Sequence, residues 1–297
     1  MQSIQQPKRF DYFQLLILSA IWGSSFLAID VAIKNMSPFI LAYGRIGFAT
    51  LFLLFVVYYK KLPFPRDKNV WIILTIAGVI NNAIPFFLIS WGQQFINGST
   101  AAIMLSTGPF VALVSSHFIT NDEKFSLFKL LSVVLGFGGV FVLVGGDIAS
   151  QNIDAVYGEI AVFCATLGYI GSGLLIRKIA HLNTIVCSTS MLLIATLFMT
   201  PFLFFEDLYR VHFTYTSVFL VLYLAIVPTA IASLFRVKMV QRVGVQFMSQ
   251  VAYLIPIFAI FWTWLFFSKI PSANAVIALI LILSGLFIRR IKSNDRL

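Results

Sequence analysis

Arg45 is the one basic residue that lies well inside an apolar stretch of this sequence, in the segment AYGRIGFAT. An arginine in the middle of a membrane span costs at least about 2.5 kcal/mol, so we expect its side chain to face a cavity or a partner. A guanidinium group can hold a carboxylate or a phosphate through two parallel hydrogen bonds. Arg45 is therefore a candidate anion-binding residue. The alternative is a structural tie to backbone carbonyls or to Asp30, and an Asp30–Arg45 pair could also form an extracellular gate.

Uncharged polar residues recur near the middle of other apolar stretches. An unpaired amide or hydroxyl in hydrocarbon is unfavourable, so these side chains should face one another or a wet cavity. Trp22 and Tyr169 occupy matching places in the two halves of the chain and are candidates for a wall on which a substrate stacks. The residues that we expect to bind substrate are Trp22, Ser25, Arg45, Asn81, Asn82, Thr107, Tyr169, Ser172, Gln250 and Tyr253.

Prolines also lie well inside these stretches, where neighbouring helices must re-satisfy the backbone groups that they free. A bend at a proline offers carbonyl ligands and a compliant point for a moving helix. The alternative is a static kink. The residues that we expect to act as gates or hinges are Asp30, Pro85, Pro109, Pro228 and Pro256.

Enzyme chemistry is not indicated. The sequence has no HExxH, no phosphate-binding glycine loop and no pair of intramembrane aspartates. Cys164 and Cys187 are the only cysteines and are too few for a metal site. Asp30 and Glu159 lie near the ends of apolar stretches and not at their middles, which argues against a buried-acid proton relay. We therefore expect no catalytic residue, no metal and no cofactor.

The elements that must position these residues are membrane helices. Of the 297 residues, 60% are hydrophobic and only 11% are charged, whereas about 25% are charged in a soluble domain. About 20 apolar residues cross a bilayer, and this length recurs ten times in one continuous domain, 1–297. The expected spans are 12–32, 38–59, 70–91, 99–119, 127–145, 156–177, 184–205, 215–236, 244–268 and 272–290.

The basic residues give the orientation. A cytoplasmic N-terminus places 17 of the 21 lysines and arginines on the inner side, Arg236 among them, as the positive-inside rule requires. Both termini are then cytoplasmic. The net charge of +10 is spread over short loops, which does not indicate a nucleic-acid partner.

The two halves repeat. A constant shift of 147 pairs Pro109 with Pro256 and lands the first five spans on the last five. Five spans is an odd number, so the second half, 148–297, enters the membrane upside down relative to the first, 1–147. Inverted repeats are typical of secondary transporters, which bind a small-molecule substrate between the halves. Spans 5 and 10 are almost purely apolar; they are expected against the lipid bilayer and are candidates for a homodimer contact.

The motifs IWGSSF, AYGRIGF and AIPFFLISWGQQFINGSTAAIMLSTGPFVALVSSHF, with NDEKFSLFKLLSVVLGFGGVFVLVGG at 121–146, resemble the EamA branch of the drug/metabolite transporter superfamily. The resemblance implies an all-α carrier in the cell inner (plasma) membrane, with a cavity lined by spans 1–4 and 6–9 and alternating access. One departure is FSKIPSANA after span 9, where the family often has a Gly-Glu pair.

The sequence thus favours a secondary-active or facilitative exporter of small metabolites, amino acids or their derivatives first. Two alternatives stay open. One is a carrier that flips lipid-linked or amphiphilic compounds, which predicts a lateral opening toward the lipid. The other is a membrane assembly subunit that keeps the fold without transport.

Overall fold

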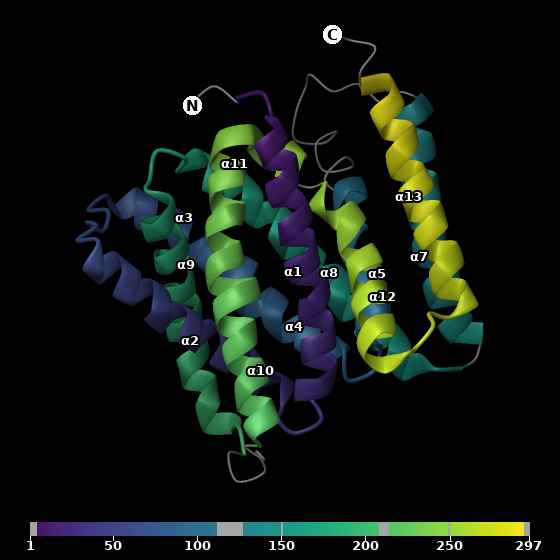
Figure 1. Cartoon of the computed structure of the whole chain (residues 1–297), viewed down its shortest axis with the longest axis horizontal. Coiled ribbons are helices and arrows are strands. Elements are labelled where there is room, and N and C mark those ends of the chain that lie inside the picture. The colour runs from purple at the N-terminus through teal and green to yellow at the C-terminus, as the bar shows by residue number, and fades with distance from the viewer. Residues whose placement is uncertain (1–4, 112–126, 150, 208–213, 249, 294–297) are drawn as a thin grey trace.

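The computed structural model describes residues 5–111, 127–149, 151–207, 214–248 and 250–293, and every regular element in these ranges is a helix (Figure 1). The prediction of an all-α chain is confirmed for this part. The helices are α1 (Arg9–Ala32), α2 (Pro38–Tyr59), α3 (Lys68–Gly78), η1 (Val79–Ala83), α4 (Ile84–Gly92), α5 (Gly98–Leu105), α7 (Leu127–Ala149), α8 (Ile153–Lys178), α9 (Thr184–Met199), η2 (Thr200–Phe205), α10 (Tyr215–Ala225), η4 (Ile226–Ile231), α11 (Ala232–Met248), α12 (Val251–Phe267) and α13 (Ala273–Ser293).

Six helical stretches of the described residues are long and apolar enough to cross a membrane. They agree with six of the expected spans and are Arg9–Ala32, Pro38–Tyr59, Lys68–Gly92, Ile153–Lys178, Thr184–Phe205 and Tyr215–Gly244. Three further expected spans fall on shorter apolar helices: Leu130–Leu143 within α7, Val251–Phe267, and Ala273–Gly285 within α13. The remaining one, 99–119, lies partly outside the described residues. Ten spans therefore remain a prediction.

Polar caps start the helices after short connections. Ser37 precedes α2 and accepts a hydrogen bond from the Ile40 amide at 3.2 Å, while Pro38 supplies the fixed φ that suits a first helical residue. Asn97 caps α5 in the same way through the Thr100 amide at 3.0 Å. Each cap satisfies an amide that the helix itself leaves unpaired, so these residues fix where the spans begin.

Two π-helical turns interrupt long spans at matching places. The first, η1, is followed by Pro85, and the second, η4, contains Pro228. Proline lacks an N–H and its ring clashes with the carbonyl four residues before it, and a π turn widens the helix locally. The first residues of the two turns, Val79 and Ile226, are separated by the same shift of 147 that relates the sequence halves.

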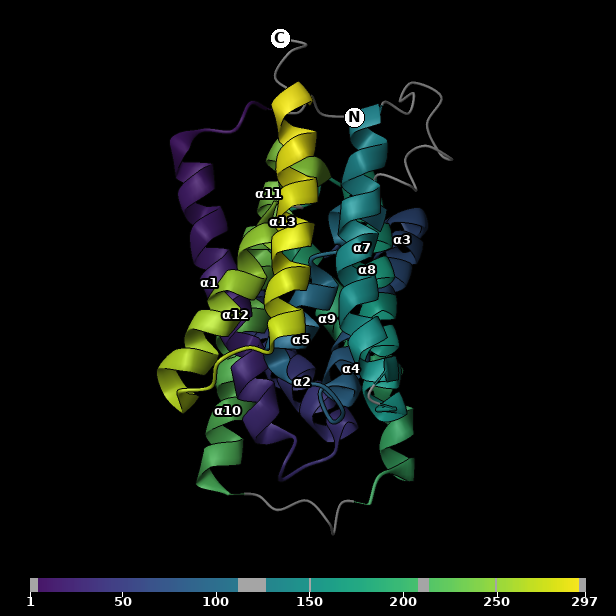
Figure 2. The ribbon, with the colours of Figure 1, turned by 90° about the vertical axis from the view of Figure 1, so that its right-hand side faces the viewer.

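Helices far apart in sequence pack as pairs. The most extensive contacts join α7 with α13, α1 with α12, α4 with α8, and α2 with α9. Helices α7 and α13 form the right-hand edge of the bundle in Figure 1 and lie side by side in Figure 2, which looks at that edge. A small residue permits this close contact, because a methyl group on Gly139 would come within 2.8 Å of the Ala278 carbonyl. Helix α1 begins and α13 ends at the same end of the bundle, called here the terminal end (Figure 1).

Gly168 lets α8 approach the first π turn, and this contact yields a stability prediction. A methyl group there would collide with the backbone carbonyl of Ile80, which cannot rotate away, and would also press on Pro85. We expect Gly168→Ala to lower the free energy of unfolding by about 1–3 kcal/mol through overpacking. Thermal unfolding of purified protein in lipid nanodiscs measures this.

Gly47→Ala is the matched control, because a methyl group on Gly47 of α2 meets nothing within 4 Å and alanine is the better helix former. Gly47→Ala should leave the midpoint temperature of thermal unfolding unchanged or raise it. Equal midpoints for Gly168→Ala and Gly47→Ala would contradict the close approach of α8 to η1.

Candidate functional site

A cavity lies between the two π turns. The volume of this cavity is about 180 Å³. Its wall is built by α1, α2, η1, α4, α8, η4, α11 and α12, together with three residues of the stretch 105–109. The described parts of α7 and α13 add nothing, in keeping with their expected place outside the cavity. Helix α9 also adds no lining residue, although the resemblance implied that its span would.

The structure brings six of the ten expected substrate-binding residues to this wall: Trp22, Ser25, Arg45, Asn81, Asn82 and Tyr169. Ser172 is fully buried behind it and donates to Asn81 Oδ1 at 2.8 Å. Thr107 is buried and donates to the Met104 carbonyl at 2.8 Å. Gln250 and Tyr253 lie at the start of α12 and outside the lining.

Of the expected hinge residues, Pro109 and Pro228 line the cavity, whereas Pro85 and Pro256 do not. The Pro228 carbonyl in the second π turn accepts a hydrogen bond from the Trp22 indole at 3.0 Å, so it is used within the protein, and a carbonyl ligand for the substrate remains a prediction. This hydrogen bond fixes one edge of the indole against η4. Stacking of a substrate on Trp22 remains a prediction.

Arg45 is buried, with 4% of its surface exposed. Its Nε donates to Thr229 Oγ1 at 3.1 Å, and its guanidinium carbon lies 4.0 Å from the centre of the Phe86 ring. Within the described residues Nε is the only nitrogen of this guanidinium group with a hydrogen bond, so its terminal N–H groups are available to a ligand. A cation over an aromatic face is attracted by the ring, which helps to hold the side chain in place.

Asp30 does not pair with Arg45 in this structure. Its carboxylate accepts hydrogen bonds from Gln93 Nε2 and from the Gly98 amide, the latter at 2.9 Å. Gly98 begins α5, and a carboxylate at a helix N-terminus is stabilised by the helix dipole. Ile29 lines the central cavity, whereas Asp30 lines a second hollow. The hydrogen bonds of Asp30 therefore lie at the second hollow, one residue along α1 from the central cavity.

Arg236 is the site residue that the sequence reasoning missed. It was counted with the cytoplasmic basic residues, but it lines the cavity and is 8% exposed. The cause is the length of its helix, which continues from Tyr215 to Gly244 and so carries Arg236 inside instead of ending there. A signal was present: Thr229, Ser233 and Arg236 have the i, i+4, i+7 spacing that puts residues on one helical face.

A chain of hydrogen bonds connects Arg236 to the first π turn. Arg236 Nη2 donates to Ser172 Oγ at 3.1 Å and to the Tyr169 carbonyl at 3.2 Å. Ser172 donates to Asn81, whose amide nitrogen donates to Asn82 Oδ1 at 2.9 Å. The polar groups on this side of the cavity thus hold one another in a fixed arrangement.

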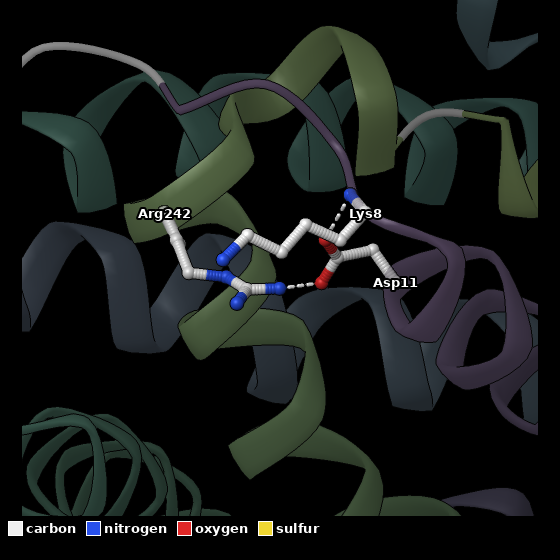
Figure 3. A network of polar contacts seen from close by, with 3 residues as sticks. All are labelled: Lys8, Asp11 and Arg242. Carbon is white, nitrogen blue, oxygen red and sulfur yellow. Dashed lines mark hydrogen bonds and ion pairs between the residues drawn. The ribbon is translucent and has the colours of Figure 1, made fainter.

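The terminal end of the bundle is tied by an ion pair between Asp11 and Arg242, seen together with Lys8 in Figure 3. Asp11 is fully buried and also accepts the Lys8 amide at 2.7 Å. The Gln5 amide donates to the Arg242 carbonyl at 3.0 Å. Helix α11 changes direction at Gly244, whose φ of 87° is a conformation that side-chain-bearing residues avoid. This network, called here the terminal clasp, joins the start of α1 to α11.

Metal chemistry has no candidate ligands in the described part of the chain, because no group of three or more His, Cys, Asp or Glu residues gathers there. Six long apolar helical stretches, with a cavity between the helices that two arginines line, define a multi-pass membrane protein. The chain belongs to the EamA-like transporter family, whose sequence profile matches residues 10–145 and 156–290. The proteins of this family are transporters and not enzymes.

Proteins with similar sequences are also named as transporters. The chain is 24% identical over 279 residues to the uncharacterized transporter YoaV of Bacillus subtilis (strain 168), covering 92% of this chain and 94% of the relative. It is 22% identical over 289 residues to an uncharacterized transporter of Archaeoglobus fulgidus, covering 95% and 97%. A solved crystal structure superposes with a TM-score of 0.72 at 17% identity, covering 97% of this chain and 99% of that one. This last likeness shows a shared fold.

Proposed function

We propose that this membrane transporter is a secondary-active or facilitative exporter of small metabolites that carry an anionic group, amino acids or their derivatives first. It would lie in the cell inner (plasma) membrane with both termini cytoplasmic. Its ten spans would form two inverted five-span repeats, 1–147 and 148–297. Two separate matches to one family profile and the recurrence of the π turns support the repeat. A homodimer through α7 and α13 is part of the same proposal.

The observation that carries the substrate class is the buried Arg45 at the cavity wall. A buried cation is stable only with a compensating partner, and Thr229 and Phe86 supply a hydroxyl and a ring but no negative charge. A carboxylate or phosphate entering the cavity would supply it through two parallel hydrogen bonds.

Alternating access requires that the two ends of the cavity open in turn. Two polar ties are placed to serve as the gates. The terminal clasp joins α1 to α11 at one end, and Asp30 joins α1 to Gln93 and to the start of α5 further along the same helix. Both ties involve α1, so a tilt of that helix between the π turns would release one tie while keeping the other.

The test is a profile of the compounds that cells release into the medium. Cells overproducing the wild type should enrich a small anionic or zwitterionic compound, and Ser233→Phe should abolish the enrichment because a phenyl ring on this lining residue fills the cavity. Thr75→Phe on the exposed face of α3 is the matched control and should export like the wild type at equal membrane abundance.

Other outcomes separate the alternatives. An amphiphile that changes leaflet in vesicles, with no compound enriched in the medium, would replace export with lipid flipping. Enrichment that survives in Ser233→Phe would place the transport path elsewhere in the protein. No turnover of either kind would favour a membrane assembly subunit.

A further inference from the structure

The cavity holds two buried arginines and no acid. Arg45 on α2 and Arg236 on α11 both line it, and neither Asp nor Glu is among its described lining residues. The two guanidinium groups are held differently, one through Nε and the other through Nη2. Neither is paired with a carboxylate of a described residue by any of these hydrogen bonds, so the described wall carries two positive charges and no negative one.

Arg236 also has a buried hydrogen-bond donor that nothing in the described structure satisfies. Its Nη1 is inaccessible to solvent and has no hydrogen-bond partner there. A buried donor without a partner is destabilising, more so on a charged group, and native structures keep few of them. The structural role of Arg236 uses only Nη2, toward Ser172 and the Tyr169 carbonyl, so the remaining donor needs another explanation.

The two charges are spaced along one face of the α10–α11 span. Arg45 is bound at the level of Thr229, and Arg236 lies seven residues further along that helix, which corresponds to about 10 Å of helical rise. Tyr169 of α8 also lines the cavity, and its carbonyl accepts a hydrogen bond from Arg236. The cavity between the two arginines is lined with uncharged polar and apolar groups. A ligand that met both arginines would therefore carry its two anionic groups at its two ends.

We propose that the cavity binds a small metabolite with two separated anionic groups, a dicarboxylate or a carboxylate that also bears a phosphate, and that Arg236 is the residue that selects the second group. This rests on the proposed function and narrows it at the same site: the anionic group at Arg45 is kept, and a second anionic group takes the place of the ammonium of a simple amino acid. A simple zwitterionic amino acid would leave Arg236 unpaired and would bring an ammonium group for which the described lining offers no acid. A dianion neutralises both arginines at once.

The test is a series of probes of nearly equal size and different charge: succinate, succinamate and succinamide. Binding to the purified wild type in lipid nanodiscs is measured by titration calorimetry at neutral pH. We expect succinate to bind at least about 10-fold more tightly than succinamate, as loss of one charge-assisted contact requires, and succinamide to bind weakest. 3-Phosphoglycerate, which has a phosphate at one end, is titrated in the same way. Comparing its affinity with that of succinate shows whether the cavity prefers a phosphate or a carboxylate as the second anionic group.

Variants assign the discrimination to residues. Arg236→Gln should bind succinate and succinamate equally, while Arg236→Lys should retain a preference for the dianion. Arg66→Gln, which removes an exposed loop arginine, should keep the wild-type ratio. A wild type that binds succinamate as tightly as succinate and 3-phosphoglycerate, or that binds none of these probes, overturns the proposal without requiring any variant to fold. The proposal is also overturned if folded Arg236→Gln keeps the wild-type ratio of succinate affinity to succinamate affinity.

This experiment is independent of transport. If dianions bind but are not moved across proteoliposome membranes, the proposed export function fails and the substrate class stands. If an exported compound is found that has one anionic group and does not require Arg236, the export function stands and the dianion proposal fails.

Discussion

Replacing Arg45 by glutamine should reduce the transport rate of the exported compound in proteoliposomes by about 100-fold. Glutamine keeps a polar side chain of moderate length, but it removes the positive charge and the two-pronged donor. Truncating one partner of a buried charged contact costs about 3 kcal/mol, and each 1.4 kcal/mol is about tenfold in binding or rate. Arg45→Lys keeps the positive charge but lacks the two-pronged donor. Its transport rate should lie between those of the wild type and Arg45→Gln, about 10-fold below the wild type.

The control for this prediction separates substrate binding from a structural tie. Thr229→Val removes the only hydrogen-bond partner of Arg45 Nε that the described residues provide while leaving the guanidinium in place, so its transport rate should fall much less. If Arg45→Gln instead loses folded protein, and the fraction that remains transports at the wild-type rate, Arg45 is a structural residue and the anion-binding role is wrong.

Replacing Asp11 by asparagine should produce the largest loss of stability among single polar substitutions at the terminal end. Asp11 is fully buried and pairs with Arg242, whose side chain is 29% exposed. Asparagine preserves an oxygen for the Lys8 amide but removes the charge. Because the arginine is partly solvated, we expect a loss of about 1–3 kcal/mol, read as a lower thermal midpoint in nanodiscs.

Asp154→Asn is the matched control for the clasp. Asp154 is likewise an acid in the first turn of a helix, α8, but it is exposed, so its loss should cost well under 1 kcal/mol. A double-mutant cycle with Arg242→Gln then isolates the pair. Additive effects of Asp11→Asn and Arg242→Gln would show that the two side chains do not stabilise each other.

Much of the site could be predicted from the sequence, because a polar side chain within an apolar span must face a cavity or another polar group. Arg45, Asn81 and Tyr169 each lie within a long apolar stretch, and all three line the cavity. Ser172 and Thr107 also lie within apolar stretches, but their hydroxyl groups donate to other groups of the protein, Ser172 to Asn81 and Thr107 to the Met104 carbonyl. Sequence alone does not distinguish a hydroxyl that faces a ligand from one that faces its neighbour.

The residues that were missed lie near predicted span ends. Arg236 was taken for a cytoplasmic residue because a count of apolar positions ends the span there, yet the helix continues past it and a π turn shifts its register. No prediction was made for Asp11 from the sequence, and it is buried because α11 packs near the start of α1 and places Arg242 against its carboxylate. Both depend on contacts with residues more than 60 positions away in the sequence.

The sequence by itself determined that the chain is helical and apolar, where most spans begin, and that a proline within a span, Pro109, recurs as Pro256 after a shift of 147. These properties follow from local requirements: backbone amides in lipid must bond within the helix, caps fix its starts, and prolines force its turns. Only the tertiary structure decided that two arginines share one cavity and that Asp11 and Asp30 tie α1 at two places. Burial and pairing of a charge depend on which helices pack together, and no local pattern encodes that.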